Sequence, residues 1–312
     1  MANSSGLNRT GILSRVTVAA ITAALVGTTT AAVAAEAPVA AQPAVSTPAA
    51  SASAASAASA TAVAAAAVEH RALQGVSGSS LYWYAPNGSG GYDAREYANS
   101  TWNYIKAAQQ ADNDGDGIAD DVWAWSTSGY LSYAAGESAS TELVNVGGGW
   151  NIYNKLVSPG QLGGGAAADI IARDSSGVLW LYLGYGNGRL TTRYKVGGGW
   201  NAYNQIAGVG DLSGDGKADI VARDGSGVLW LYKGTGNYTS PFAGRTKIGG
   251  GWGVYNTILG VGDLDYDGIA DFLARDGAGK LYRYSGTGNA AAPFKPRVTI
   301  GTSGWNTYRI MF

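Results

Sequence analysis

Carboxylates gather in three short segments of the sequence, at a spacing that suits a metal ion. DNDGDGIAD (112–120), DLSGDGKAD (211–219) and DLDYDGIAD (263–271) each place oxygen-bearing side chains at positions 1, 3, 5 and 9 and a glycine at position 6. Clustered carboxylates repel one another at neutral pH unless a cation lies among them. The segments are therefore either metal sites or solvated acidic turns.

The oxygen-only donor set favours calcium, because Ca²⁺ binds hard oxygen ligands and accepts backbone carbonyls among them. The three segments hold four, three and four carboxylates at these positions, hence eleven of the 22 acidic residues, which is more than a solvated surface would concentrate. Mg²⁺ or Mn²⁺ and an unoccupied acidic turn are the alternatives. The predicted calcium ligands, with position 7 giving its backbone carbonyl, are Asp112, Asp114, Asp116, Ile118, Asp120, Asp211, Ser213, Asp215, Lys217, Asp219, Asp263, Asp265, Asp267, Ile269 and Asp271.

These segments are not EF-hands, and one repeat lacks the site. An EF-hand needs a bidentate Glu at position 12 and flanking helices, whereas here position 12 is Trp123, Ala222 or Ala274. The related segment QLGGGAAAD (161–169) keeps only its last aspartate, Asp169. A repeat of this kind can therefore lack the calcium ligands, so we expect the ion to stabilise individual loops.

The sequence gives little support for a catalytic site. The one histidine, His70, comes before the first strand, which argues against a nucleophile–histidine pair or a histidine zinc site inside the fold. A glycosidase-type carboxylate pair stays open in principle. We expect the recurring aspartates to sit in hairpin turns and the recurring arginines beside them to form structural ion pairs; these are Asp174, Asp224, Asp276, Arg173, Arg223 and Arg275.

Tryptophan and tyrosine are abundant and invite a carbohydrate-binding interpretation. Those that recur at equivalent positions are expected to pack between repeats; they are Trp150, Trp180, Trp200, Trp230 and Trp252. The non-repeating Trp83, Trp123 and Trp125 are the predicted ligand-binding residues.

A repeat of about fifty residues must position these segments. Trp recurs at 102, 150, 200, 252 and 305, mostly after glycines and within Trp-Asn-x-Tyr. An apolar strand such as LWLY (179–182) recurs with the same spacing. Each unit reads as four short antiparallel strands separated by Gly/Asp/Ser/Asn turns. Strands that are apolar at nearly every position have both faces covered, which predicts a β-propeller; an elongated β-solenoid is the alternative.

The two ends of the repeat region complement each other. Residues 72–84 align with 272–284 and supply the later strands of a repeat without its first strand, whereas GWNTYRIMF (304–312) is a first strand alone. Joining them closes a ring without a free sheet edge. The predicted fold is therefore an all-β, five-bladed propeller of four-stranded blades, with one blade closed by the N- and C-terminal strands.

The DxDxDGxxD loop between two strands, in units such as GVGDLSGDGKADIVARDGSGVLWLYKGTG, resembles the FG-GAP/VCBS repeat. The resemblance covers about residues 69–312 and is strongest over 211–312. It implies a calcium-binding β-propeller used for adhesion or ligand binding, as in integrin α chains and many secreted bacterial proteins, and it does not imply a substrate. Ser213 and the segment 161–169 depart from the pattern.

The first 68 residues predict export. Two arginines precede an uncharged stretch that ends in Ala32-Val33-Ala34, which indicates a Sec-type signal peptide over 1–35; a membrane anchor fits less well, because no basic cluster follows. Residues 36–68 are rich in Ala, Ser and Pro and predict a disordered linker. We expect the propeller at 69–312, secretion, and no membrane insertion after cleavage.

The net charge and the composition limit the classes of binding partner that the protein is expected to have. Without the two leader arginines, 19 of the 21 basic side chains stand against 22 acidic ones, which argues against nucleic acid as a partner. With no cysteine, no disulfide can hold the fold. We expect a monomeric, non-catalytic module that binds a glycan or a cell-surface protein. The alternatives are a secreted carbohydrate-active enzyme, such as a polysaccharide lyase or hydrolase, and a structural cell-envelope protein.

Overall fold

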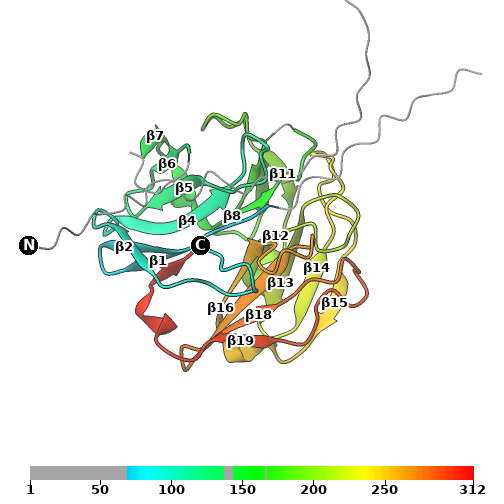
Figure 1. Cartoon of the computed structure of the whole chain (residues 1–312). Helices are drawn as coiled ribbons and strands as arrows, with labels where there is room; N and C mark the ends of the chain where they lie inside the picture. The colour runs from blue at the N-terminus through cyan, green and yellow to red at the C-terminus, as the bar shows by residue number, and fades with distance from the viewer. Residues whose placement is uncertain (1–68, 137–142, 166) are drawn as a thin grey trace, which may run out of the picture. The chain divides into compact units, whose positions relative to one another are not determined.

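The computed structural model describes residues 69–136, 143–165 and 167–312, so the predicted signal peptide (1–35) and linker (36–68) lie outside the described residues. Within the described residues, five four-stranded antiparallel sheets form the five blades of a β-propeller (Figure 1). Four blades are continuous in sequence, namely β4 (Ile105–Ala111) to β7 (Val144–Gly147), β8 (Tyr153–Gly160) to β11 (Tyr194–Gly197), β12 (Tyr203–Gly210) to β15 (Thr246–Gly249) and β16 (Tyr255–Gly262) to β19 (Val298–Gly301).

The second and third strands of these blades are short and mostly buried. They are β5 (Asp121–Ser126), β6 (Leu131–Ala134), β9 (Asp169–Asp174), β10 (Leu179–Tyr182), β13 (Asp219–Asp224), β14 (Leu229–Tyr232), β17 (Asp271–Asp276) and β18 (Leu281–Tyr284). All six residues of β5 are buried. Neighbouring blades therefore cover both faces of this strand, as its uninterrupted apolar pattern indicates.

The fifth blade combines both ends of the propeller chain, as predicted. Its strand order is β20 (Ile310–Met311), β1 (Leu73–Ser77), β2 (Ser80–Tyr84) and β3 (Glu96–Asn99). The C-terminal strand β20 pairs with β1 through Val76 opposite Ile310 and Gly75 opposite Met311. The first strand of each blade lies innermost, since β12 packs against both β8 and β16, and β4 packs against β8 and β20.

Each Trp-Asn-x-Tyr segment differs from the expected continuous strand. Its first part is a 3-10 turn, seen in η1 (Trp150–Ile152), η2 (Trp200–Ala202), η3 (Trp252–Val254) and η4 (Trp305–Thr307), and the strand begins only at or after the tyrosine. The preceding glycine causes the turn, because Gly199 and its equivalents have φ near +86°, a conformation that side chains with a Cβ disfavour.

The tryptophans that open the repeats pack between blades, as predicted, whereas Trp180 and Trp230 on the third strands are half-buried and pack against these clusters from their edge. Trp252 opens the β16–β19 blade, is 7% exposed, and shares a core cluster with Leu229 and Leu231 of the preceding blade. Trp200 is likewise 7% exposed and packs with Leu179 and Leu181 of the blade before it. The turn therefore carries a large apolar side chain into the junction between two sheets.

The recurring arginines join blades, but not through the expected ion pairs with the neighbouring turn aspartates. Arg223 Nη1 donates to the carbonyl oxygens of Trp252 (2.9 Å) and Tyr255 in the next blade. Arg173 and Arg275 do the same at their junctions. Arg309 donates from beside β20 to the carbonyl of Ile105 (2.6 Å), so the closing blade is tied as well. A guanidinium suits this role, because it offers five donors in a fixed plane.

The turn aspartates behave as expected. Asp224 Oδ1 accepts from the backbone amides of Ser226 and Val228, which closes the β13–β14 hairpin, and Oδ2 accepts from Trp230 Nε1 at 2.9 Å. Among the helices of the described residues, none is long and apolar enough to cross a membrane.

Candidate metal loops and a rim groove

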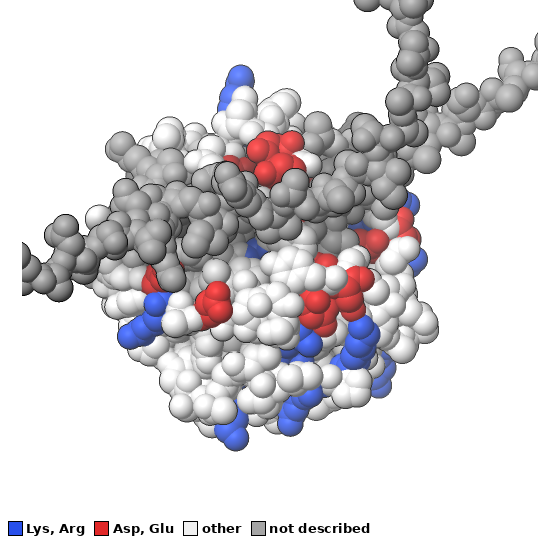
Figure 2. Space-filling model, in the orientation of Figure 1, with Lys and Arg blue, Asp and Glu red and all other residues white. Residues whose placement is uncertain are grey.

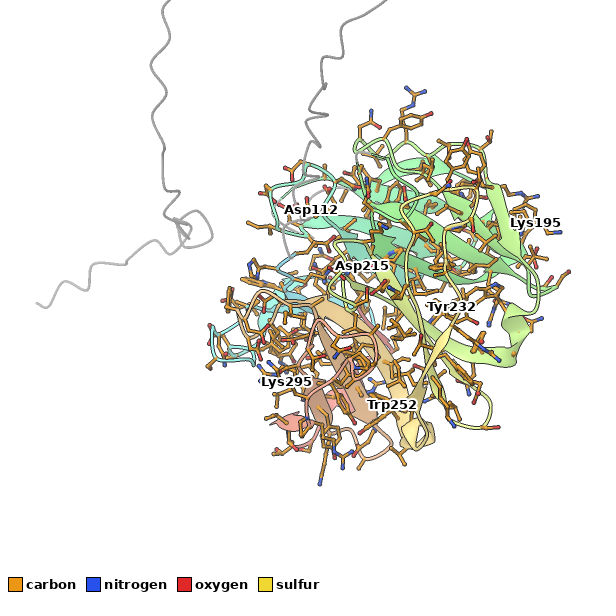
Figure 3. The ribbon with its side chains drawn as sticks, turned by 90° about the vertical axis from the view of Figure 1, so that its right-hand side faces the viewer. Asp112, Lys195, Asp215, Tyr232, Trp252 and Lys295 are labelled. Carbon is orange, nitrogen blue, oxygen red and sulfur yellow. The ribbon has the colours of Figure 1, made fainter. Side chains whose placement is uncertain are left out.

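The three acidic segments connect the first and second strands of their blades, as β4–β5, β12–β13 and β16–β17 loops. Carboxylate oxygens of Asp112, Asp114 and Asp116 lie within 4.8 Å of one another, and so do those of Asp263, Asp265 and Asp267. Figure 3 labels Asp112 and Asp215 in two of these loops, and Figure 2 shows acidic side chains in separate clusters on one face.

The first aspartate of each loop folds the chain around the cluster. Asp263 accepts backbone N–H groups from Asp267 at Oδ1 (3.0 Å) and from Gly268 at Oδ2 (2.7 Å). Asp112 and Asp211 accept the same position-6 amide, from Gly117 and Gly216, and also the amide of the glycine at position 4 of their loops. The remaining carboxylates are thereby brought to one side of a tight turn.

The third position of the loop tests whether a cation fits. Asp265 Oδ1 is buried without a hydrogen-bond partner, and Ser213 Oγ, at the same position of its loop, is also buried without a hydrogen bond of normal geometry. A buried oxygen without a partner costs about 1–3 kcal/mol, and metal coordination would satisfy it. Hard oxygens left unpaired at the same place in two loops therefore fit a hard divalent cation.

The last aspartate of the motif organises the backbone. Asp271 is fully buried and accepts N–H groups from Leu264 (3.1 Å), Asp265 (3.2 Å) and Gly286 (3.0 Å). Asp219 binds three equivalent amides. These residues tie the acidic loop to the turn after the third strand.

In the β4–β5 loop, Asp121 takes this organising place. It accepts N–H groups from Asn113 (3.2 Å) and Gly136 (3.2 Å), whereas Asp120 is one residue earlier in a loop longer by one residue. Sequence reasoning missed Asp121 because the DxDxDGxxD spacing ends at Asp120. Aligning the strand DVWAW with its equivalent DIIAR would have found it, because Asp121 begins β5 as Asp169 begins β9.

Burial raises the pKa values of several of these carboxyl groups when no cation is bound. Desolvation raises the pKa of Asp271 to about 7, with the Asp265 carboxylate adding to the rise, and raises the pKa of Asp219 to about 6. Burial, with Asp121 and Asp116 nearby, raises the pKa of Asp120 to about 6. A bound cation would lower all three, because it favours the charged form.

Basic side chains already lie at the edge of two loops. Lys233 Nζ is 3.2 Å from Asp215 Oδ2, and Lys295 Nζ is 2.6 Å from Asp267 Oδ2 (Lys295 is labelled in Figure 3). Arg283 Nη2 lies 3.2 Å from Asp265 Oδ2. The lysine pairs are partly exposed, so solvent screens them, and they offset only part of the loop charge.

The segment 161–169 keeps the loop shape without a metal-binding set. Asp169 accepts N–H groups from Leu162, Gly163 and Gly184, as Asp271 does in its loop. A Cβ at Gly163 would lie 2.2 Å from Leu183 Cδ2. The equivalent of Leu183 is Ser285, whose Oγ donates to Asp265 Oδ2 at 2.7 Å. An apolar side chain has therefore replaced both the oxygen at position 3 and its partner.

The predicted ligand-binding tryptophans are mostly inaccessible. Trp123 is 1% and Trp125 4% exposed, because both lie on β5, which neighbouring blades cover. They cannot present a free ring face to a sugar, so the prediction is wrong for these two. Trp83 on β2 is half-buried and keeps that option.

A groove lies at the rim of the β12–β15 blade. It has a volume of about 460 Å³ and lies between the end of β11 and the aromatic residues Trp200, Tyr203, Tyr232 and Phe242. The hydroxyls of Tyr203 and Tyr232 lie 2.5 Å apart, and Arg245 donates to Tyr203 Oη. The Arg245 guanidinium also lies over the Trp230 ring, 4.1 Å from its centre. Figure 3 labels Tyr232.

The same arrangement recurs around the rim. Arg193 donates to Tyr153 Oη (3.0 Å), Arg297 to Tyr255 Oη, and Arg95 to Tyr308 Oη (3.3 Å). Each of these arginines also lies over an aromatic ring of the third strand, namely Trp180, Tyr282 or Tyr82. The sequence signal is an arginine just before the fourth strand of four blades, at Arg95, Arg193, Arg245 and Arg297.

The β4–β7 blade lacks this arrangement. Leu143 precedes β7 where the other blades have arginine, and Ile105 and Ala134 replace the two tyrosines. Four blades therefore carry the Arg–Tyr–Tyr set, and one does not.

One family model matches part of the repeat region. The family model described as FG-GAP-like repeat matches residues 167–222 and 211–274. No curated protein sequence matches the chain.

Solved structures share low identity with this chain. The BP39L lectin from Burkholderia pseudomallei is 15% identical, with a TM-score of 0.44, over 76% of this chain and 72% of that chain. A triple arginine-to-alanine mutant of AofleA from Arthrobotrys oligospora is 10% identical, with a TM-score of 0.43, over 77% and 75% of the two chains.

Proposed function

Residues 167–274 are FG-GAP-like repeats within a five-bladed propeller, and from this premise we propose that the protein is a secreted, calcium-stabilised, non-catalytic module that binds a glycan. Export follows from the N-terminal sequence pattern over residues 1–35. The calcium and the glycan each rest on a separate observation.

The observation that carries the calcium proposal is the unpaired buried oxygen at position 3. Asp265 Oδ1 lies in a cluster of three carboxylates and has no hydrogen-bond partner. Calcium held there would neutralise the carboxylates of the loop. The chain's own residues already do the rest: Asp263 holds the turn, and Asp271 anchors it to the neighbouring hairpin.

Each ion would add moderate stability to the propeller. If free calcium is about tenfold above a weak dissociation constant, each site contributes roughly 1.4 kcal/mol. Three such sites would supply several kcal/mol, a large part of the usual stability of a domain. This matters in a chain without cysteine.

The rim groove supports a binding role. It combines the half-buried rings of Tyr232 and Phe242 with an exposed arginine, which are side chains that hold polar, ring-shaped ligands. The one histidine, His70, lies away from this groove, because its backbone bonds to Gly117 O (2.8 Å) and its Nδ1 lies 3.1 Å from Asp263 O. A histidine-assisted reaction in the groove therefore has no support from its placement.

A glycan array probed with the full chain, with calcium and with chelator, tests the proposal. Saturable binding of intact glycans supports the module. Shortened oligosaccharides would instead support the enzyme alternative, and neither binding nor cleavage would favour a structural cell-envelope role.

A further inference from the structure

Four arginines at the rim form no direct ion pair with a carboxylate of the described residues, although Asp174 and Asp224 lie close enough to Arg193 and Arg245 for an electrostatic interaction that lowers the pKa of each aspartate. Arg95, Arg193, Arg245 and Arg297 are exposed. The ion pairs of the described residues involve other basic side chains, namely Arg71, Lys233, Arg283 and Lys295. Asp224 is close to Arg245 in its blade, but its carboxylate oxygens accept hydrogen bonds from Trp230 Nε1 and from the amides of its turn. The guanidinium of Arg245 is therefore free to meet an external anion.

The surroundings fix the orientation of each guanidinium. Arg245 lies over the Trp230 ring and donates one hydrogen bond to Tyr203 Oη, so most of its five N–H donors make no hydrogen bond to described residues. Being held on an aromatic face lowers the entropy that it would lose on binding a ligand. The Arg245 guanidinium is therefore preorganised for binding a ligand, unlike a mobile surface charge.

The groove beside Arg245 has the size and lining for a sugar ring. Its volume of about 460 Å³ falls within the usual range for small-molecule sites. Phe242 and Tyr232 offer apolar surface, and Thr239 and Ser240 offer polar groups at its edge. A pyranose ring has apolar C–H faces and a polar rim, which match these two kinds of surface.

We propose that the rim groove at Arg245, and the three equivalent Arg–Tyr–Tyr sets around the rim, bind saccharide units that bear a carboxylate, as in a polyuronate. This proposal rests on the proposed glycan-binding function and names its ligand class and its site. The planar guanidinium matches a carboxylate with two parallel hydrogen bonds, whereas a neutral sugar leaves its charge unbalanced.

The repetition of the groove makes a polymer the natural ligand. Four Arg–Tyr–Tyr sets on one ring of blades can engage separate units of one repeating chain, and avidity can then exceed single-site affinity by about 10²–10⁴. The β4–β7 blade, with Leu143 in place of the arginine, does not contribute. Binding of a single monosaccharide unit is therefore expected to be weak and binding of the polymer strong.

The experiment measures binding of the calcium-loaded full chain to three immobilised polymers by surface plasmon resonance. Polygalacturonate carries carboxylates, fully methyl-esterified polygalacturonate has the same backbone without charge, and dextran sulfate carries sulfates alone. The variants are Arg245→Gln, the quadruple Arg95→Gln/Arg193→Gln/Arg245→Gln/Arg297→Gln, and the control Lys280→Gln. Lys280 is exposed at the β17–β18 turn, so the control removes one charge elsewhere.

We expect polygalacturonate to bind at least about 30-fold more tightly than its methyl ester. Arg245→Gln should weaken binding about threefold to tenfold, the quadruple variant more than about 100-fold, and Lys280→Gln less than twofold. Thermal unfolding of each variant reports whether the fold survives. If the quadruple variant does not fold, the four single Arg→Gln variants decide, since each leaves the other three Arg–Tyr–Tyr sets intact.

Equal binding of the ester, preference for dextran sulfate, or unchanged binding by the arginine variants would overturn the inference. If a neutral glycan binds on the array while polygalacturonate does not, only this inference fails. If no saccharide binds in either experiment, the proposed function fails with it.

Discussion

The loops 263–271 and 161–169 occupy the same place in two blades, yet only the first has a metal-binding set. Both end in a fully buried aspartate, Asp271 or Asp169, that accepts three backbone N–H groups. They differ at the third position, where Asp265 Oδ1 is unpaired and Gly163 faces Leu183.

The difference separates two functions that the acidic motif combines. The last aspartate shapes the loop and is needed with or without a metal. The carboxylates at positions 1, 3 and 5 form the cluster proposed to bind a cation, and a blade can lose them when an apolar contact fills their place. The comparison therefore divides the motif into a folding part and a metal part.

Removing the shared aspartate should give the largest effect. Asp169→Ala leaves three buried N–H groups without their acceptor, at about 1–3 kcal/mol each, so we expect a loss of roughly 3–9 kcal/mol in the free energy of unfolding. Asp271→Ala should cost at least as much. Urea unfolding of both variants measures this, with Asp169→Asn as the milder control because it keeps one acceptor oxygen.

Chelator distinguishes the two folding aspartates. The loss in Asp169→Ala should be the same with and without chelator, because its loop has no metal set. A loss that disappears in chelator would show that loop 161–169 is metal-dependent after all, and would break the comparison.

Restoring position 3 in the metal-free loop tests why that site is missing. Gly163→Asp alone should destabilise the protein by about 1–3 kcal/mol, because its Cβ would overlap Leu183 Cδ2. Adding Leu183→Ser, which copies Ser285, should recover most of that loss. Thermal unfolding of the single and double variants measures both steps, and an equally unstable double variant would contradict the explanation.

Much of this fold could be predicted from the sequence, because the same pattern of residues recurs in each repeat. The fifty-residue period, the strand patterns and the complementary ends predicted five blades and their closure between β20 and β1. The loop spacing also predicted the clusters around Asp112 and Asp263. A repeat multiplies weak local signals, so the shared pattern survives where single copies are ambiguous.

The remaining features depend on contacts between distant residues. Arg223 was expected to pair with a nearby acid but reaches carbonyl oxygens about thirty residues away, in the next blade. Trp123 appeared to be a free ligand residue because it does not repeat, yet a covering blade buries it. Burial and partner choice are set by blade packing, which the local sequence does not record.

A smaller effect is expected from pH. In the metal-free protein the pKa of Asp271 is raised to about 7 and that of Asp219 to about 6, above the unfolded value of about 3.9. The folded state then binds more protons than the unfolded state, so this contribution to stability is present at low pH and is lost as pH rises towards 7. With calcium the trend should reverse, because the ion favours ionised carboxylates.

Melting temperatures between pH 5 and 8, with chelator and with calcium, measure this trend. Asp271→Asn cannot ionise, so it should flatten the dependence seen in chelator. An identical pH dependence in this variant and the original protein would exclude Asp271 as its source.

Isothermal titration of calcium into the chelator-treated full chain tests the central claim most directly. We predict three ions per chain, one each for loops 112–120, 211–219 and 263–271. The double variant Asp265→Asn/Asp267→Asn should bind two, whereas Gln161→Ala, in the loop without a metal set, should still bind three. No calcium binding, or a stoichiometry that the Asp265→Asn/Asp267→Asn variant leaves unchanged, would contradict the account.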